Sequence, residues 1–181
     1  MRIETERLVV RAYQDNDLQE AFELMQDNDL FTYLPMEIMT FEEYKELFSW
    51  LIGCYEISPQ HDWYKYSFVI TRKDDGRHVG WCGIGSLDFN HSSKEIFYLI
   101  GKPFWGMGYA SEAVKALVEY CFNELALAEL VAVVKPGNQP SRKVLDKLGF
   151  EYVHQVSGLP EEFDFYNGEL YYTLSKENCN S

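Results

Sequence analysis

Apolar residues recur every three to four positions between residues 110 and 122, a spacing that predicts a helix with one buried face. The stripe consists of Ala110, Ala113, Val114, Leu117, Val118, Cys121 and Phe122. Shorter apolar runs, rich in β-branched and aromatic residues, predict strands elsewhere. Residues 64–71 and 79–87 are two such runs, and the turn signal Asp74-Asp75-Gly76 between them predicts a hairpin.

These patterns place helices and strands in a definite order. The expected elements are a strand at 3–12, a helix begun by Asp15 or Asp17, a helix begun by the capping-box residues Thr40 and Glu43, strands at 64–71, 79–87 and 95–100, a helix from about residue 109, a strand at 130–134, a helix at 138–148 and strands at 151–157 and 169–174. Residues 90–94 are expected to form a turn. The order predicts an α/β (α+β) fold, a mixed sheet with helices on both faces.

The chain is 181 residues long and contains no repeat, low-complexity segment or interior linker. This length is typical of one domain. We therefore expect residues 1–175 to form a single domain and residues 176–181 to be a frayed tail.

Two glycines, Gly106 and Gly108, lie between the apolar run 96–100 and the helical stripe. Backbone N–H groups of such a loop can close around an anion, because glycine has no side chain. The unpaired N–H groups and the dipole of the following helix favour negative charge there. Two nucleotide motifs do not fit: Met107 replaces the lysine of a Walker loop, and Ser111 replaces the third glycine of the dinucleotide fingerprint.

A second segment, residues 134–150, supports an anion-binding loop over a simple glycine turn. A β-branched run ends at Pro136-Gly137, and Asn138 is suited to cap the next helix. Val144, Leu145 and Leu148 give that helix an apolar stripe, and Gly149 can end it.

Together the two segments resemble the GNAT superfamily of acyl-CoA-dependent N-acyltransferases. The family pattern is Arg/Gln-x-x-Gly-x-Gly/Ala after the fourth strand, then an Asn near the start of a later helix, then Gly-Phe at the end of that helix. This chain carries Gly106, Gly108, Asn138, Gly149 and Phe150 in that order. Pro103 stands where the family often has Arg or Gln, but backbone amides can still bind the anion.

The resemblance extends over the whole chain. Residues 3–11, 98–113 and 138–150 are similar to the branch of the superfamily that acetylates ribosomal-protein N-termini. It implies a mostly antiparallel sheet of about seven strands that splays between the fourth and fifth strands. It also implies acetyl-CoA as co-substrate and a protein N-terminal α-amine as acceptor. The same branch holds acetylases of small amines, so a polyamine, an amino acid or an aminoglycoside is the alternative acceptor.

The resemblance also implies which residues bind acetyl-CoA. The pyrophosphate would be held by the backbone amides of Trp105, Gly106, Met107, Gly108, Tyr109 and Ala110. The pantetheine arm would pair with the backbone of Leu99, Ile100 and Gly101, where one amide faces the thioester oxygen. Asn138 would contact the pantetheine from the opposite side, in addition to or instead of capping its helix.

Two residues are candidates for proton transfer. Many family members use a Tyr on the helix after the Asn as the acid for the leaving thiolate, but the matching position here is Leu145. We expect Ser141, which the ribosomal-protein branch shares, to donate that proton; the alternative is a helix residue that only supports the cap. Glu95 is the candidate base, and alternation places it on the face of Phe97 and Leu99. The alternative for Glu95 is a solvated charge at a strand end.

The acceptor side is expected to involve residues 16–52, including the loop 27–39, and the segment 157–168, which mixes acids with aromatics. Three further aromatic candidates for its lining are Tyr33, Trp63 and Tyr98.

The net charge of −13 disfavours a nucleic-acid partner and suits a cationic amine or peptide substrate, although solubility alone would also explain it. The four cysteines and four histidines show no ligand spacing, so no metal site is expected. The absence of a membrane-length apolar run and of a leader predicts a cytoplasmic protein without a membrane partner. The sequence leaves open whether the chain is a monomer or a homodimer. It also leaves open a non-catalytic module that only binds acyl-CoA.

Overall fold

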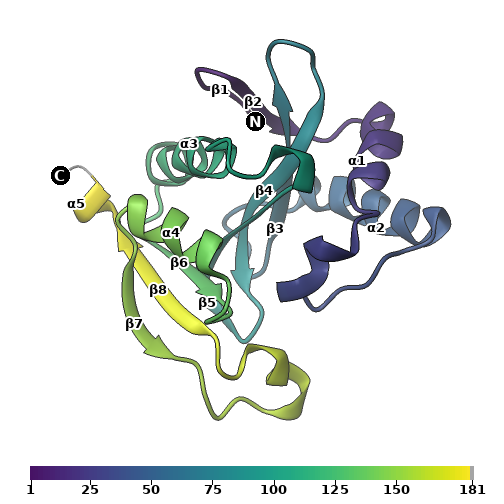
Figure 1. The fold of residues 1–181 in the computed structure, drawn as a ribbon. Coiled ribbons are helices and arrows are strands. Elements are labelled where there is room, and N and C mark those ends of the chain that lie inside the picture. The colour runs from purple at the N-terminus through teal and green to yellow at the C-terminus, as the bar shows by residue number, and fades with distance from the viewer. Residues whose placement is uncertain (180–181) are drawn as a thin grey trace.

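Eight strands form one open sheet in a computed structural model that describes residues 1–179 (Figure 1). Their order across the sheet is β1-β2-β3-β4-β5-β6-β8-β7. The strands are β1 (Arg2–Glu4), β2 (Leu8–Ala12), β3 (Lys65–Arg72), β4 (His78–Leu87), β5 (Asn90–Ile100), β6 (Glu129–Val134), β7 (Glu151–Gln155) and β8 (Leu170–Ser175). All neighbouring strands pair antiparallel except β5 and β6, which are parallel. This confirms the expected mixed, mostly antiparallel sheet.

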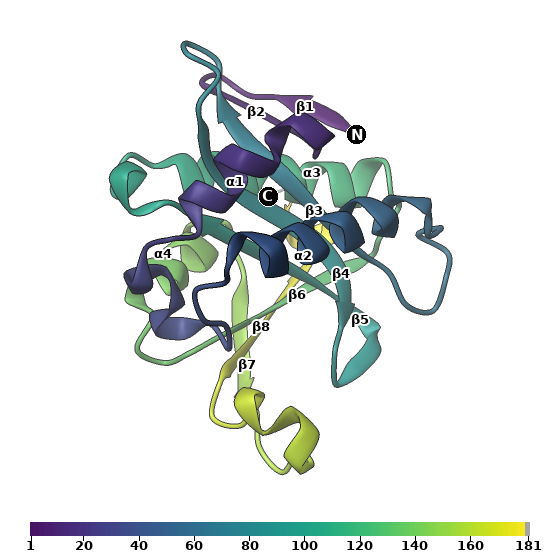
Figure 2. The same ribbon diagram turned by 90° about the vertical axis from the view of Figure 1, so that its right-hand side faces the viewer.

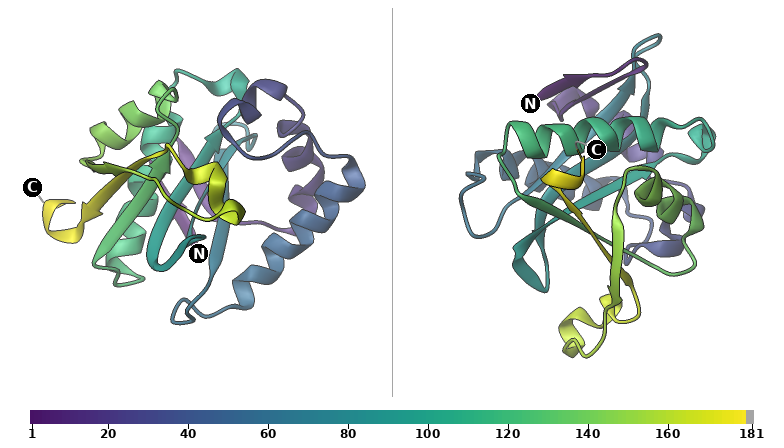
Figure 3. Two further views of the ribbon diagram at one scale, coloured as in Figure 1. Left: turned by 90° about the horizontal axis from the view of Figure 1, so that it is seen from below. Right: turned by 90° about the vertical axis from the view of Figure 1, so that its left-hand side faces the viewer.

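Helices cover both faces of this sheet (Figures 2 and 3). The α-helices are α1 (Leu18–Leu24), α2 (Phe41–Gly53), α3 (Tyr109–Asn123), α4 (Gln139–Lys147) and α5 (Lys176–Cys179). Short 3₁₀ helices lie between them: η1 (Asp15–Asp17), η2 (Asn28–Tyr33), η3 (Cys54–Glu56), η4 (Lys102–Phe104) and η5 (Glu161–Tyr166). Figure 2 shows α1 and α2 in front of the strands and α3 behind them.

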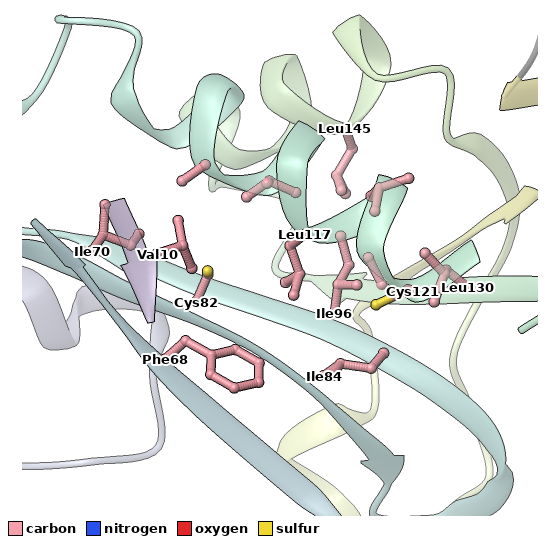
Figure 4. Close-up of a cluster of buried hydrophobic side chains, with 14 of the residues drawn as sticks. Val10, Phe68, Ile70, Cys82, Ile84, Ile96, Leu117, Cys121, Leu130 and Leu145 are labelled. Atoms are coloured by element: carbon pink, nitrogen blue, oxygen red, sulfur yellow. The ribbon is translucent and has the colours of Figure 1, made fainter. Parts of the chain in front are cut away.

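The larger hydrophobic core lies between the sheet and the two helices α3 and α4. Leu117 and Cys121 from the predicted helical stripe pack there against Ile84, Ile96 and Leu130 of the strands (Figure 4). A second cluster joins α1 and α2 to the other face of the sheet. Because a strand presents alternate residues to opposite faces, β5 contributes to both clusters: Ile96 and Ile100 to the first, Leu99 to the second.

The first predicted strand, residues 3–12, is in fact two strands. Thr5 accounts for the break, because its hydroxyl accepts a hydrogen bond from the Leu8 amide at 3.0 Å and its backbone amide donates one to the Leu8 carbonyl oxygen at 3.0 Å. A side chain that bonds its own backbone in this way favours a turn. The sheet therefore has eight strands rather than about seven.

The expected turn at residues 90–94 was also wrong. β5 already begins at Asn90, which pairs with Leu87, so the hairpin connection is only Asp88-Phe89. The polar residues that suggested a turn extend the hairpin instead, and the first three of them are exposed.

The C-terminal segment forms a short helix where we expected a frayed tail. The Lys176 amide donates to the carbonyl oxygen of Ala128 at 2.9 Å, and its ammonium to that of Phe122 at 2.7 Å. These bonds tie the start of α5 to the last turn of α3 and to the connection between α3 and β6. Residues 180–181 of the expected tail lie outside the described residues.

Candidate functional site

β5 and β6 separate at one point, and this point organises the site. Their registered parallel pair within the described sheet is Glu95 opposite Val131. Beyond it, towards Ile100, β5 continues along β4 without β6. This is the splay that the family resemblance implied between the fourth and fifth predicted strands.

The glycine loop at the end of β5 has the geometry of an anion site. Gly106 and Gly108 have φ values of +76° and +80°, in the left-handed region that side chains disfavour. Gly108 caps α3, whose first helical bond runs from the Glu112 amide to the Gly108 carbonyl at 3.1 Å. The amides before Glu112 therefore have no partner within the helix and are available to an anion.

Arg7, in the turn between β1 and β2, supports this loop from behind. Its Nη1 donates to the Met107 carbonyl oxygen at 2.9 Å, and its Nε to Glu112 Oε2 at 2.7 Å. Its backbone amide also donates to Glu112 Oε1, at 2.8 Å. In the sequence, Arg7 stands out only as part of the family-like segment 3–11, because nothing local indicates that a residue about 100 positions away braces the loop.

Only some of the β5 amides that were expected to bind the pantetheine arm point away from β4. The Gly101 amide donates to the Val79 carbonyl oxygen of β4 at 2.8 Å, so this amide is not available to a ligand. Because amide directions alternate along a strand, the backbone amide of Leu99 also points towards β4. The amides of Ile100 and Tyr98 face the gap left by β6 instead. Of the three residues predicted to contact the pantetheine, only Ile100 has an amide that points into the gap. The Tyr98 amide, which was not predicted, points there as well.

A cavity of about 350 Å³ opens where the strands separate. Glu95 of β5 lines it together with Asn138 and Ser141 of the α4 N-terminus, so three predicted site residues meet there. The glycine loop, residues 105–110, is not part of the cavity lining, which includes residues 95–98 of β5. An extended cofactor would have to reach from the loop, along β5, to the cavity.

Glu95 is buried, with 8% of its surface exposed, so it is not a solvated strand-end charge. Burial raises the pKa of its carboxyl to about 8, and the nearby charges of Asp88 and Glu169 add to this rise. Lys65 and the Val133 amide oppose it. A carboxyl with such a pKa can accept and release a proton near neutral pH.

The first turn of α4 presents the other two predicted residues. Asn138 Oδ1 accepts from the Ser141 amide at 3.2 Å, so Asn138 caps the helix as expected. Ser141 lines the cavity, and its side chain hydrogen-bonds that of Tyr98. The Tyr98 hydroxyl donates to the Ser141 carbonyl oxygen at 3.2 Å and spans the gap between β5 and α4. Leu145, 1% exposed, packs into the core and has no proton to give (Figure 4).

The segment 157–168 forms one wall of the cavity through Phe165 and Tyr166. Tyr166 donates a hydrogen bond to Asp88 Oδ2 at 2.6 Å. The Lys135 ammonium bonds the Phe165 carbonyl oxygen, lies 3.7 Å from the Phe165 ring centroid and pairs with Glu169 Oε1 at 3.2 Å. Glu169 is buried, and burial raises its pKa. Neither Lys135 nor Glu169 was predicted, because only the fold brings them to the site.

Of the three aromatic residues predicted to line the acceptor side, two line the cavity and one does not. Tyr33 and Tyr98 line the cavity, and Tyr33 closes one side by donating to the Gly137 carbonyl oxygen at 3.0 Å. Trp63 does not line it. Its ring packs instead on Trp50, with 6.2 Å between the ring centroids, and Trp50 is the residue at the cavity.

Residues 1–179 contain no group of three His, Cys, Asp or Glu side chains placed to hold a metal ion. In the same part of the chain, no helix has both the length and the apolar character to span a membrane.

Comparisons with known proteins agree with this geometry. The acetyltransferase (GNAT) domain family matches residues 7–151, and the chain belongs to this family. It is 30% identical over 166 residues to the uncharacterized N-acetyltransferase p20 of Bacillus licheniformis, covering 92% of this chain and 89% of that protein. The protein is thus an N-acetyltransferase of the GNAT class, a class that uses acetyl-CoA.

Two solved structures share the fold. A GNAT-family acetyltransferase from Bacillus anthracis superposes with a TM-score of 0.81 at 25% identity, covering 98% of this chain and 99% of that one. A ribosomal-protein α-N-acetyltransferase, RimL, in complex with coenzyme A, superposes with a TM-score of 0.79 at 17% identity, covering 97% and 98%. The similarity to RimL, at 17% identity, shows a shared fold alone.

The glycine loop gives a first prediction. Gly106→Val should raise the dissociation constant of acetyl-CoA at least about tenfold, because a side chain at φ +76° costs roughly 1–2 kcal/mol and would occupy the anion's position. Isothermal titration calorimetry would measure it. Gly76→Val is the matched control, since Gly76 has φ +73° in an exposed hairpin turn. It should lower the melting temperature without changing the dissociation constant; equal affinity in both variants would contradict the loop assignment.

Burial of Glu95 gives a second prediction. Its folded-state pKa of about 8 exceeds the ordinary value, so its contribution to stability is lost as the pH rises towards 8. Glu95→Gln stays neutral and should therefore raise Tm by about 3 °C or more at pH 9, with a much smaller gain at pH 5. Thermal unfolding at both pH values measures this. The capping-box residue Glu43 has a lowered pKa, so Glu43→Gln should shift Tm equally from pH 6 to 9. A Glu95→Gln gain independent of pH would refute the assignment.

Proposed function

We propose that this protein transfers the acetyl group of acetyl-CoA to a primary α-amine, with a protein N-terminus of the ribosomal-protein type as acceptor. The observation that carries the proposal is a buried carboxyl, Glu95, at the point where β5 and β6 separate. It lies near the middle of β5, in a cavity shared with Asn138 and Ser141. Cytoplasmic location is part of this proposal.

The cofactor would lie along the gap. The amides of residues 105–110 bind the pyrophosphate, and each hydrogen bond to a charged acceptor contributes roughly 1.5–3 kcal/mol. The Tyr98 and Ile100 amides, which face the gap, pair with the pantetheine arm and polarise the thioester oxygen. Asn138 contacts the arm from the opposite side, through the Nδ2 that its capping bond leaves free.

Proton affinities favour an α-amine over a lysine. An α-amine has an ordinary pKa of about 8, close to that of Glu95, also about 8. Proton transfer between them is therefore nearly balanced. A lysine amine, with an ordinary pKa of about 10.4, would cost about 3 kcal/mol more to deprotonate with the same carboxylate. The neutral amine then attacks the thioester carbon, the C–S bond breaks and the leaving thiolate takes a proton.

Ser141 is the proposed donor of that last proton. Ser141 lines the cavity beside Tyr98, which its side chain hydrogen-bonds, and the buried Leu145 has no proton to donate in place of the tyrosine that many family members use. The Asn138 cap and the Tyr98 bond fix the first turn of α4, and hence the serine, across the gap from β5.

A small-molecule amine is the second candidate acceptor. It is supported by the cavity, whose volume of about 350 Å³ is at the lower end of typical small-ligand pockets. Thiol release from acetyl-CoA, measured with unstructured peptides and with a panel of polyamines, amino acids and aminoglycosides, would separate the two. Turnover of peptides alone supports the first candidate. Tight cofactor binding without transfer to any amine would support a non-catalytic acyl-CoA module instead.

Replacing Glu95 tests the base. In the wild-type protein kcat/KM should rise with pH through about 8, as the carboxyl ionises. Glu95→Gln should lower kcat at least about 100-fold at pH 7.5, because a general base contributes about 10²–10⁴ in rate. Glu119→Gln, on the exposed face of α3, is the control and should keep the wild-type rate. A Glu95→Gln enzyme within threefold of wild type would remove Glu95 from the mechanism.

Replacing Ser141 tests the acid. Ser141→Ala should lower kcat at least about 100-fold while the dissociation constant of acetyl-CoA stays within about twofold of wild type. Ser49→Ala on α2 removes a comparable helical hydroxyl, which bonds only the Lys45 carbonyl oxygen, and should leave both constants unchanged. If Ser141→Ala is fully active and Tyr98→Phe is not, the donor is the tyrosine.

A further inference from the structure

The cavity continues from Glu95 beneath α1 and α2, and its walls change character along the way. All its charged lining residues lie at the Glu95 end: Lys65, Asp88, Glu95, Lys135 and Glu169. The part under the helices is lined mainly by apolar and aromatic side chains: Tyr13, Met25, Leu34, Pro35, Met36, Tyr44, Leu47, Trp50, Leu51, Trp81 and Phe97. A ligand that fills the cavity therefore needs a charged end and an apolar body.

The charged end suits an ammonium group. Three carboxylates share it with two ammonium groups, those of Lys65 and Lys135. Both ammonium groups already have partners, since Lys65 lies 3.5 Å from Asp88 and Lys135 lies 3.2 Å from Glu169. Glu95 is thus the carboxyl left for an incoming amine.

The apolar part begins one pleat along β5, at Phe97, whose ring centroid lies 5.4 Å from Lys65 Nζ of the charged end. Phe97 follows Glu95 on the same face of the strand, about 7 Å further on. The Phe97 ring lies over Gly83 of β4, where a Cβ atom would overlap it. Glycine at position 83 therefore leaves room for this ring to form the floor of the cavity.

Trp81 extends the same floor. Its ring meets Phe97 edge-on with 6.0 Å between centroids, and its Nε1 contacts Met25 Sδ at 3.5 Å. Leu47 and Leu51 of α2 pack over the second core cluster from above. An apolar group held between this floor and α2 would be placed a few ångströms from an amine bound at Glu95.

From this arrangement we infer that the preferred acceptor is an α-amine whose own first side chain is large and apolar, such as leucine or phenylalanine. The amine binds at Glu95, and its side chain binds on Phe97 and Trp81 beneath α2. Small or hydroxylated first residues leave this surface unfilled, and polyhydroxylated or polycationic amines cannot satisfy their polar groups there. The inference rests on the proposed function, because it specifies the substrate of the same site.

Four peptides that differ only in their first residue, Ala, Ser, Leu or Phe, test the inference with the intact protein. Their α-amines are alike, so the side chain alone decides the result. We expect kcat/KM, from thiol release, to be at least tenfold higher for Leu and Phe than for Ala and Ser. Equal or higher values for Ala and Ser would overturn the inference and leave the proposed function standing. Failure of all four, with acetyl-CoA bound, would overturn both.

Variants in the apolar wall test which residues cause the preference for a large apolar first residue. Phe97→Leu should reduce the Phe-to-Ala ratio of kcat/KM to below threefold through KM, without changing the affinity for acetyl-CoA. Leu47→Ala, on α2, tests the opposite wall and keeps the test decisive if Phe97→Leu does not fold. Tyr152→Leu removes an exposed aromatic ring from β7 and should retain the full ratio. A ratio unchanged in both wall variants would overturn the placement.

Discussion

The divergence of β5 from β6 beyond the Glu95–Val131 pair is the constraint on which the rest of the structure depends. A strand inside a sheet normally has both of its edges paired, and unpaired buried N–H and C=O groups are costly. Here β4 satisfies one edge of β5, while the amides of Tyr98 and Ile100 face the gap. The core beneath α3 holds the two halves of the sheet together, so the gap persists and a ligand can complete the pairing.

Side chains alternate along β5, so the two faces of this strand contact different parts of the protein. Glu95, Phe97 and Leu99 face α1 and α2, where the cavity can take an acceptor. Tyr98 faces α4 and contacts its first turn. In the proposed mechanism, acetyl-CoA and the acceptor bind on neighbouring sides of this one rigid strand. The sheet then positions the reacting groups more precisely than loops would. The buried carboxyl lowers stability at high pH, a cost often found at functional sites.

Local signals predicted the parts of the fold that local physics determines. The Thr40–Glu43 capping box, the α3 stripe and the start of α3 directly after the two glycines depend on residues close in sequence, and each was confirmed. The orientation of the Gly101 amide depends on the register with β4, and the bracing by Arg7 on the packing of a distant hairpin. Such features depend on which strands pair, which the sequence pattern did not specify.

The same nonlocal packing separates the roles of the two buried glutamates. Glu169 pairs with Lys135, whose ammonium also holds the wall segment through Phe165. This pairing stabilises the charged form of Glu169, even though burial keeps its pKa raised. Glu95 has no cation in such direct contact, since Lys65 is nearer to Asp88. Its charge is therefore the less stabilised of the two, and it has the stronger tendency to take a proton from a bound ammonium. Glu169 fixes the wall of the cavity, and in the proposed mechanism Glu95 is the group left to move the proton.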